Sequence, residues 1–261
     1  MKRRFHRICI LVFLIFPFYL VASGNSKVGF INNIKKTIST DYLNFYSPKN
    51  LKYLLGGFFL AGISANTNVD RDIRDWYQQS IRNNTTDQFS KVVKPIGNIY
   101  KPLSIYAGFT LLGNITKNTT LGATAYEIGS KSLRAIIVGA PMVGILQYGL
   151  GASRPYEGSS KWHLFNDTNS VSGHAFMGAV PFLTISKMVQ PKYLKMFFYI
   201  GSFATGFSRI NDNKHYFSQI AFGWWIAFLS VNSVDISQKS KIEIDPVYFG
   251  NGCRIRLCLS L

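Results

Sequence analysis

Long apolar segments alternate with shorter polar stretches along most of the chain. The apolar segments are 51–65, 95–113, 121–151, 174–189, 193–208 and 216–231. Apart from 121–151, they stand near the short limit of what spans a bilayer, so they suit either the core of a buried bundle or a tightly packed membrane bundle. In both cases the pattern predicts an all-α helical bundle.

A polar stretch, 66–94, precedes most of these segments. Its apolar residues lie at roughly helical spacing, which predicts a surface helix followed by a loop. Residues 25–50 are also polar and mixed. We therefore expect a polar N-terminal region with one apolar helix over 25–94, and the helical bundle over 95–233.

The C-terminal stretch has a different period. "KIEIDPVYFGNGCRIRLCLSL" alternates apolar and polar residues around "GNG", which predicts a short β-hairpin in a β-like tail over 234–261. Cys253 and Cys258 would lie on one strand, too far apart along it to form a disulfide with each other.

Residues 1–24 have the three-part pattern of a secretory signal. A basic start, "MKRRFHR", is followed by the apolar run "ICILVFLIFPFYLVA" and by the small residues Ala22 and Gly24. The segment is predicted to be a signal peptide or an uncleaved N-terminal anchor. Either form takes the body of the protein out of the cytoplasm.

Composition adds an expectation about partners. The chain has 261 residues, 47% of them apolar and only 16% charged, and its formal net charge is +17. The length allows one large domain with a real core. The positive charge favours anionic partners such as phosphorylated substrates or lipid head groups. Nucleic acid is not expected, because no basic run with interleaved aromatic residues is present.

Polar residues that are able to bind a ligand or take part in catalysis stand at the ends of the apolar segments. They are Arg154-Pro155 after 121–151, Ser172-Gly173-His174 at the start of 174–189, Ser208-Arg209 at the end of 193–208, and His215 before 216–231. If consecutive helices run antiparallel with short connections, these points fall at the same end of the bundle. The turn at the opposite end, "SKMVQPKYLK", holds Lys187, Lys192 and Lys195 and no comparable group.

This set of residues suits the binding of a phosphate group. Arginine offers forked donors that match phosphate oxygens, and a helix start adds free N–H groups and partial positive charge. Gly173 lets the backbone approach an anion closely, and Ser172 can donate through its hydroxyl. Two histidines allow covalent catalysis, one ring attacking phosphorus and the other transferring protons. The structural alternatives are a helix cap and a packed core histidine. The sequence has no metal-ligand spacing, so no metal or other cofactor is expected.

The order and spacing of these residues resemble the signature of the phosphatidic acid phosphatase type 2/vanadium haloperoxidase superfamily. The similar elements are Arg154-Pro155, Ser172-Gly173-His174, and Ser208-Arg209 followed after five residues by His215. The resemblance implies an acid phosphatase-like helical bundle that hydrolyses phosphate monoesters or lipid (pyro)phosphates without a metal. It also implies that His215 is the nucleophile forming a phosphohistidine and that His174 is the general acid. The residues implied to hold the phosphoryl oxygens are Arg154, Arg209, Ser172 and the Gly173 amide.

Two departures from the signature change this chemistry. Gln147 stands where the family has lysine, and Gln219 stands where it has aspartate. Gln147 can still donate a hydrogen bond to phosphate but carries no charge. Gln219 can accept from the Nδ1–H of His215 and orient the ring, yet it does not stabilise an imidazolium as a carboxylate does. Asp212 or Glu127 is the candidate for a substitute carboxylate.

Several functions stay open at this stage. The favoured one is an envelope phosphatase, and the alternatives are a degenerate phosphate- or lipid-binding relative, a soluble periplasmic acid phosphatase for small esters, and a structural or transport bundle. Apolar segments, aromatic content and positive charge favour a membrane-bound enzyme for a phosphorylated lipid. The lysine-bearing turn would then face the cytoplasm and the catalytic end the periplasm or exterior. The oligomeric state is left open.

Overall fold

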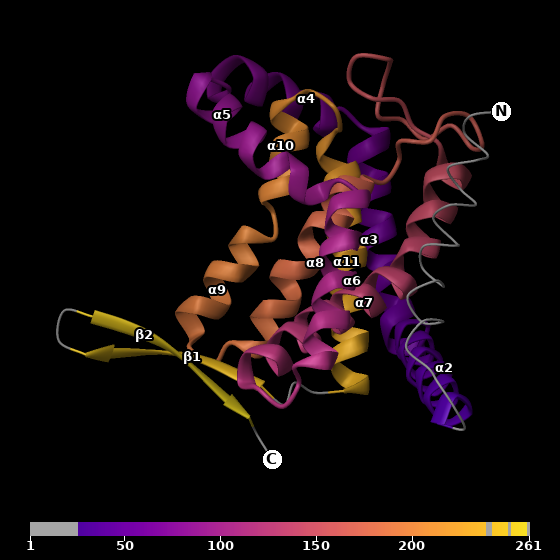
Figure 1. Ribbon diagram of the computed structural model, residues 1–261. Helices are drawn as coiled ribbons and strands as arrows, with labels where there is room; N and C mark the ends of the chain where they lie inside the picture. Colours follow the sequence, from indigo (N-terminus) through magenta and orange to yellow (C-terminus); the bar gives the residue numbers. More distant parts are fainter. Residues whose placement is uncertain (1–25, 239–241, 250–251, 260–261) are drawn as a thin grey trace. The chain divides into compact units, whose positions relative to one another are not determined.

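The computed structural model describes residues 26–238, 242–249 and 252–259 (Figure 1). The predicted signal or anchor, 1–24, lies outside the described residues. The chain divides into two compact units, Met1–Thr40 and Asp41–Leu261. The described part of the first unit is the beginning of helix α2 (Ser26–Phe45), in a stretch for which the sequence predicted only a polar region. All candidate site residues belong to the second unit.

The second unit contains the helical bundle that the apolar segments predicted. Its longer helices are α3 (Pro48–Asn66), α6 (Tyr100–Ile115), α7 (Thr120–Leu150), α8 (Gly173–Met188) and α11 (Phe217–Ser237). Helix α11 packs against α3, α7 and α8, and α6 packs along α7. Large side chains of α8 and α11, among them Phe176, Leu183, Phe222 and Ile226, are almost wholly buried. These two helices therefore form the centre of the core.

Local signals set the ends of α7 and α8. The Thr119 hydroxyl accepts from the Gly122 N–H at 3.1 Å at the start of α7. Helix α7 ends at Gly151, whose φ of +56° is a conformation that residues with a Cβ rarely adopt. The chain then runs through a long loop and enters α8 behind Ser172. This loop brings Arg154 and the start of α8 to one end of the bundle.

The apolar segment 193–208 forms two helices instead of the single one that the pattern predicted. They are α9 (Lys192–Gly201) and α10 (Ala204–Asn211). At the break, the Ser202 hydroxyl accepts from the Trp224 indole N–H at 2.7 Å, and Phe203 stacks on the same indole. The Ser202 hydroxyl also donates to the Tyr199 carbonyl, which competes with the helical hydrogen bonds of the backbone.

The polar stretch before the bundle is more structured than its pattern suggested. It forms α4 (Val69–Trp76), a π-helical turn η1 (Tyr77–Ile81), α5 (Asn84–Val93) and a 3₁₀ turn η2 (Lys94–Gly97). A reciprocal pair of hydrogen bonds between Asn83 and Thr86 starts α5. Helix α5 packs against α10, and η2 packs against α8 and α10. In Figure 1, α4, α5 and α10 gather at the end of the bundle away from the strands.

The C-terminal hairpin is confirmed. Strands β1 (Ile242–Phe249) and β2 (Gly252–Leu259) pair antiparallel, with Ile242 opposite Leu259 and Phe249 opposite Gly252. Cys253 and Cys258 lie on the same strand, and the thiol of Cys258 is free. The fold is thus all-α with a small two-stranded sheet, as predicted.

Two helices in the described part of the chain are long and apolar enough to cross a membrane, namely α7 and α11. Over half of the apolar window of α11, 56%, is buried inside the protein, as in a core helix of a water-soluble protein. Other apolar side chains point outward at helical spacing on α3 and α9. They are Leu55, Phe59 and Ile63 on α3, and Tyr193, Met196, Phe197 and Ile200 on α9. Together these features point weakly to membrane association.

Candidate functional site

His215 lies two residues before the start of α11, and Gln219 fixes its orientation. The His215 Nδ1 lies 2.8 Å from the Gln219 Oε1, which also accepts from the Tyr216 N–H at 3.1 Å. The Gln219 Nε2 donates to the Ser153 carbonyl at 2.9 Å. Turning the amide over would set donor against donor at Tyr216 and acceptor against acceptor at Ser153. The Nδ1 of His215 therefore carries the proton, and its Nε2 keeps a free lone pair.

The environment of His215 keeps the ring neutral. Its exposed fraction is 7%, and burial together with the charges of Arg209 and Arg154 lowers its pKa to about 3. The hydrogen bond with Gln219 acts in the opposite direction but does not outweigh the burial. A neutral imidazole with a fixed tautomer is the form that can attack an electrophile through Nε2.

Arg209, in the last turn of α10, is a buried cation with unused donors. Its exposed fraction is also 7%, and neither its Nε nor its Nη1 has a hydrogen-bond partner. The nearest carboxylate oxygen, Asp212 Oδ2, is 3.9 Å from Nη1. Burial lowers the pKa of Arg209, although arginine remains charged at ordinary pH. Buried guanidinium donors without partners are costly, and a bound anion would satisfy them.

Arg154 lies in the loop after α7 and is held by neighbours that the sequence analysis did not identify. Its Nε donates to the Asn169 side-chain oxygen at 2.9 Å, and its Nη1 donates to the Tyr156 hydroxyl at 2.6 Å. Asn169 is itself buried and donates to Asp167 at 2.9 Å. These contacts fix the direction of the guanidinium. Asparagine and tyrosine in a long polar loop gave no sequence signal for this role.

The start of α8 combines a helix cap with an accessible backbone. The Ser172 hydroxyl accepts from the Ala175 N–H at 3.3 Å, so the structural alternative of a cap is correct as far as it goes. A Cβ placed on Gly173 would meet nothing closer than the Gln147 amide nitrogen at 3.7 Å. The space beside the Cα of Gly173 is therefore open, so a ligand can approach the backbone at the start of α8 closely.

His174 occupies the first turn of α8 and is half-buried. Burial and the nearby cations Arg209, Lys94 and Arg154 lower its pKa to about 4. The same cations lower the pKa of His215, with the exception of Lys94. The structure thus brings His174, His215, Arg154 and Arg209 into one electrostatic environment, as their order along the chain predicted.

The remaining sequence candidates are engaged elsewhere. The Gln147 amide nitrogen donates to the Val171 carbonyl at 2.7 Å, so it supports the loop before Ser172. Asp212 accepts from Ser90 at 2.7 Å and from Lys94 at 2.8 Å. Glu127 lies 3.4 Å from Lys131 on α7. Because Gln219 occupies the Nδ1 of His215, neither carboxylate takes the place of the family aspartate.

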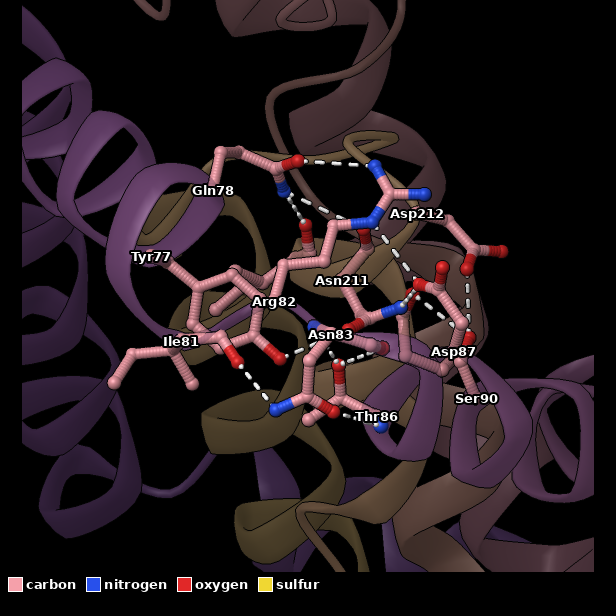
Figure 2. Close-up of polar contacts among 12 residues, drawn as sticks. Tyr77, Gln78, Ile81, Arg82, Asn83, Thr86, Asp87, Ser90, Asn211 and Asp212 are labelled. Carbon is pink, nitrogen blue, oxygen red and sulfur yellow. Dashed lines mark hydrogen bonds and ion pairs between the residues drawn. The ribbon is translucent and has the colours of Figure 1, made fainter.

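A polar network ties η1 and α5 to the end of α10 (Figure 2). The Tyr77 hydroxyl donates to the Asn211 side-chain oxygen at 3.0 Å, and the Asn211 amide nitrogen donates to Asp87 at 2.6 Å. Asp87 also accepts from Arg82 at 3.0 Å, while Gln78 donates to the Ile210 carbonyl at 2.8 Å. These bonds hold the turn between Arg209 and His215.

The donors of this site suit an anion better than a cation. Guanidinium groups, a helix start and imidazoles offer N–H donors, and the nearby cations would repel a metal ion. In the described ranges 26–238, 242–249 and 252–259, no group of three histidine, cysteine, aspartate or glutamate side chains is placed to hold a metal.

Comparison with known proteins identifies a family model that matches part of the chain. The family model of the PAP2 superfamily matches residues 131–239, a range that includes the predicted phosphate-binding and catalytic residues. No curated protein and no solved structure matches the chain. The polar network that joins η1 and α5 to the end of α10, called the clamp below, comes from residues before the matched range on its η1 and α5 side. The turn that carries Lys94 also lies before that range.

Proposed function

We propose that the protein is a metal-independent phosphatase of the cell envelope, because residues 131–239, which match the family model of the PAP2 superfamily, contain the site described above. The match supports phosphatase-type activity in general. The proposed reaction is hydrolysis of phosphate monoesters or lipid (pyro)phosphates through a phosphohistidine on His215. The observation that carries the proposal is the buried, unsatisfied guanidinium of Arg209 beside a neutral imidazole of fixed tautomer.

The first step uses the ring nitrogen that Gln219 leaves free. Arg209, Arg154 and the N–H groups at the start of α8 would hold the phosphoryl oxygens. The Nε2 of His215 attacks phosphorus, an N–P bond forms, and the bond to the leaving oxygen breaks. His174 donates a proton to that oxygen, so the alcohol departs neutral.

The second step regenerates the enzyme. His174, now neutral, takes a proton from water, which attacks phosphorus and breaks the N–P bond. Inorganic phosphate leaves, and His215 returns to its neutral form. Because His174 has a pKa of about 4 in the empty site, it needs the negative charge of a bound phosphate to hold its proton near neutral pH.

A phosphorylated lipid is the substrate class that we favour. Support comes from the outward apolar side chains of α3 and α9, the two long apolar helices and the net charge of +17. If the bundle spans the membrane, the turn with Lys187, Lys192 and Lys195 would face the cytoplasm and the site would face the periplasm or exterior. Vesicle-bound substrate added from one side tests this orientation.

Phosphate release tests the proposed function directly. The wild type and His215→Ala are assayed with p-nitrophenyl phosphate and with phosphatidic acid in mixed micelles. His163→Ala is the matched control, because His163 is an exposed histidine of the loop 151–172. We expect release by the wild type and the control and loss in His215→Ala. Equal release by all three would exclude His215 as the nucleophile, and tight phosphate binding without release by the wild type would identify a degenerate relative.

A further inference from the structure

Lys94 and Arg209 share one carboxylate oxygen. The Lys94 Nζ donates to Asp212 Oδ2 at 2.8 Å, and the Arg209 Nη1 lies 3.9 Å from the same oxygen. Asp212 is a single negative charge between two cations, and its other oxygen accepts from Ser90. Lys94, Arg209 and Asp212 together therefore carry a net positive charge, and two donors of Arg209 have no hydrogen-bond partner.

The backbone that bears Lys94 is fixed against the start of α8. Gly97, at the end of the same turn η2, is buried, and a Cβ added to it would lie 2.7 Å from the His174 carbonyl oxygen. Val93 is also buried, directly before Lys94. The Lys94 side chain itself is 48% exposed. The backbone of Lys94 is thus held in place by packing against the start of α8, whereas its ammonium group is on a flexible side chain.

The site lacks the positive charge of the signature lysine, which Lys94 can supply. Gln147 stands where the family signature has lysine, and its amide nitrogen is engaged with the Val171 carbonyl. Lys94 already acts electrostatically on His174, whose pKa it lowers together with Arg209 and Arg154. A cation at Lys94 can therefore supply part of the charge that Gln147 does not carry.

We propose that Lys94 is the third cation of the phosphate site, held by Asp212 while the site is empty and donating to a phosphoryl oxygen when it is occupied. This inference rests on the proposed function. Lysine is a compact charge on a four-carbon stem, so a change of partner needs only rotation of the side chain. The N-terminal region would in this way complete the site of the PAP2 segment.

The test compares Lys94→Met with Lys91→Met, which removes an exposed lysine one helical turn earlier on α5. Binding of orthovanadate, a phosphate mimic, is measured by calorimetry, and kcat/KM is measured with p-nitrophenyl phosphate. We expect Lys94→Met to weaken orthovanadate binding at least about tenfold and to lower kcat/KM by about 10- to 100-fold. Lys91→Met should stay within about twofold of the wild type, since surface charges far from a site act weakly. Equal effects of the two variants would overturn the inference.

A double variant separates contact with the anion from simple neutralisation of Asp212. In Lys94→Met the carboxylate of Asp212 is left without its lysine and could repel an anion by itself. If Lys94 binds the anion, Lys94→Met/Asp212→Asn remains weak, and adding Gln147→Lys to Lys94→Met restores part of the affinity. If Lys94 only neutralises Asp212, the double variant returns to wild-type affinity, and the inference is wrong.

Failure of the underlying function has a different signature. A wild type that releases phosphate and loses activity in His215→Ala, but is indifferent to Lys94→Met, would overturn the role of Lys94 alone. A wild type that neither binds orthovanadate nor releases phosphate would overturn both.

Discussion

At the scale of single residues, Gln219 joins His215 to the backbone around it. Its side chain is fully buried and makes hydrogen bonds with His215, Tyr216 and Ser153. Gln219→Asp has two conceivable outcomes, either a rise in turnover, because aspartate is the residue of the family signature, or a fall that marks a site adapted to the amide. The structure favours the second, because aspartate is shorter by one methylene and has no donor for the Ser153 carbonyl.

Gln219→Glu keeps the length of the side chain and tests this interpretation. A carboxylate facing the Ser153 carbonyl loses a buried hydrogen bond, so we expect the free energy of unfolding to fall by about 1–3 kcal/mol. The carboxylate should also raise the pKa of His215 and move the acid limb of the kcat/KM profile to higher pH. Chemical denaturation and pH-dependent kinetics measure these effects, with the exposed Gln190→Glu as control. Unchanged stability in Gln219→Glu would contradict the role given to the amide.

The two histidines predict an acidic optimum for the free enzyme. The mechanism needs His215 neutral, which requires a pH above about 3, and His174 protonated, which requires a pH below about 4. For the dianionic substrate, kcat/KM should therefore fall about tenfold per unit as pH rises above about 4. The basic limb of kcat should lie at higher pH, because bound phosphate raises the pKa of His174. A kcat/KM that is flat from about pH 4 to 8 would count against this assignment.

At the scale of elements, the polar stretch before the bundle positions the site. Helix α5 and η1 hold the end of α10, and η2 contacts the start of α8, so the polar stretch supports both the turn before His215 and the segment that carries His174. This role was hidden in the sequence. Amphipathic spacing predicted a surface helix, whereas the asparagine, aspartate and glutamine side chains that form the clamp have no periodic signal.

Gly97→Ala tests the support of α8 by η2. The added methyl group would lie 2.7 Å from the His174 carbonyl, so the turn must move away. We expect a fall in kcat/KM of about tenfold or more and a destabilisation of about 1–3 kcal/mol. Gly108→Ala in α6 is the control, because a Cβ there meets nothing within 4 Å and should stabilise the helix slightly. Full activity of Gly97→Ala would show that η2 does not position His174.

Sequence periodicity predicted the bundle helices and the hairpin, because burial imposes a regular pattern on each. It did not predict the break between α9 and α10, which depends on contacts of Ser202 and Phe203 with Trp224 on a distant helix. The convergence of His174, His215 and Arg209 followed from helix order alone. The contributions of Asn169 and Lys94 did not, because each comes from a loop or turn whose path only the fold determines.

At the scale of the whole molecule, charge and apolar surface act together. A net charge of +17 attracts anionic head groups, and the outward apolar side chains of α3 and α9 offer contact with lipid chains. Both properties support the proposal that the substrate is a phosphorylated lipid. Neither property fixes the reaction, which depends on the residues at the end of the bundle.

Membrane extraction tests the lipid-directed interpretation. We expect the full chain to remain in the membrane pellet after alkaline carbonate treatment and to enter solution with detergent. Replacement of Phe59, Ile63, Phe197 and Ile200 by serine should shift it toward the soluble fraction if α3 and α9 contact lipid. Release of the unaltered chain by carbonate would favour a soluble enzyme for small esters.

The central claim, attack by His215 on phosphorus, is tested most directly by trapping the phosphoenzyme. His174→Ala is mixed with p-nitrophenyl [³²P]phosphate and quenched in alkali, because a good leaving group needs no general acid while hydrolysis of the intermediate lacks its base. We predict that phosphohistidine accumulates on the peptide that contains His215. We also predict that the label is absent from His174→Ala/His215→Ala, and that His215→Ala alone loses turnover on the order of 10³-fold or more. Label of equal intensity in the variant without His215 would contradict the account.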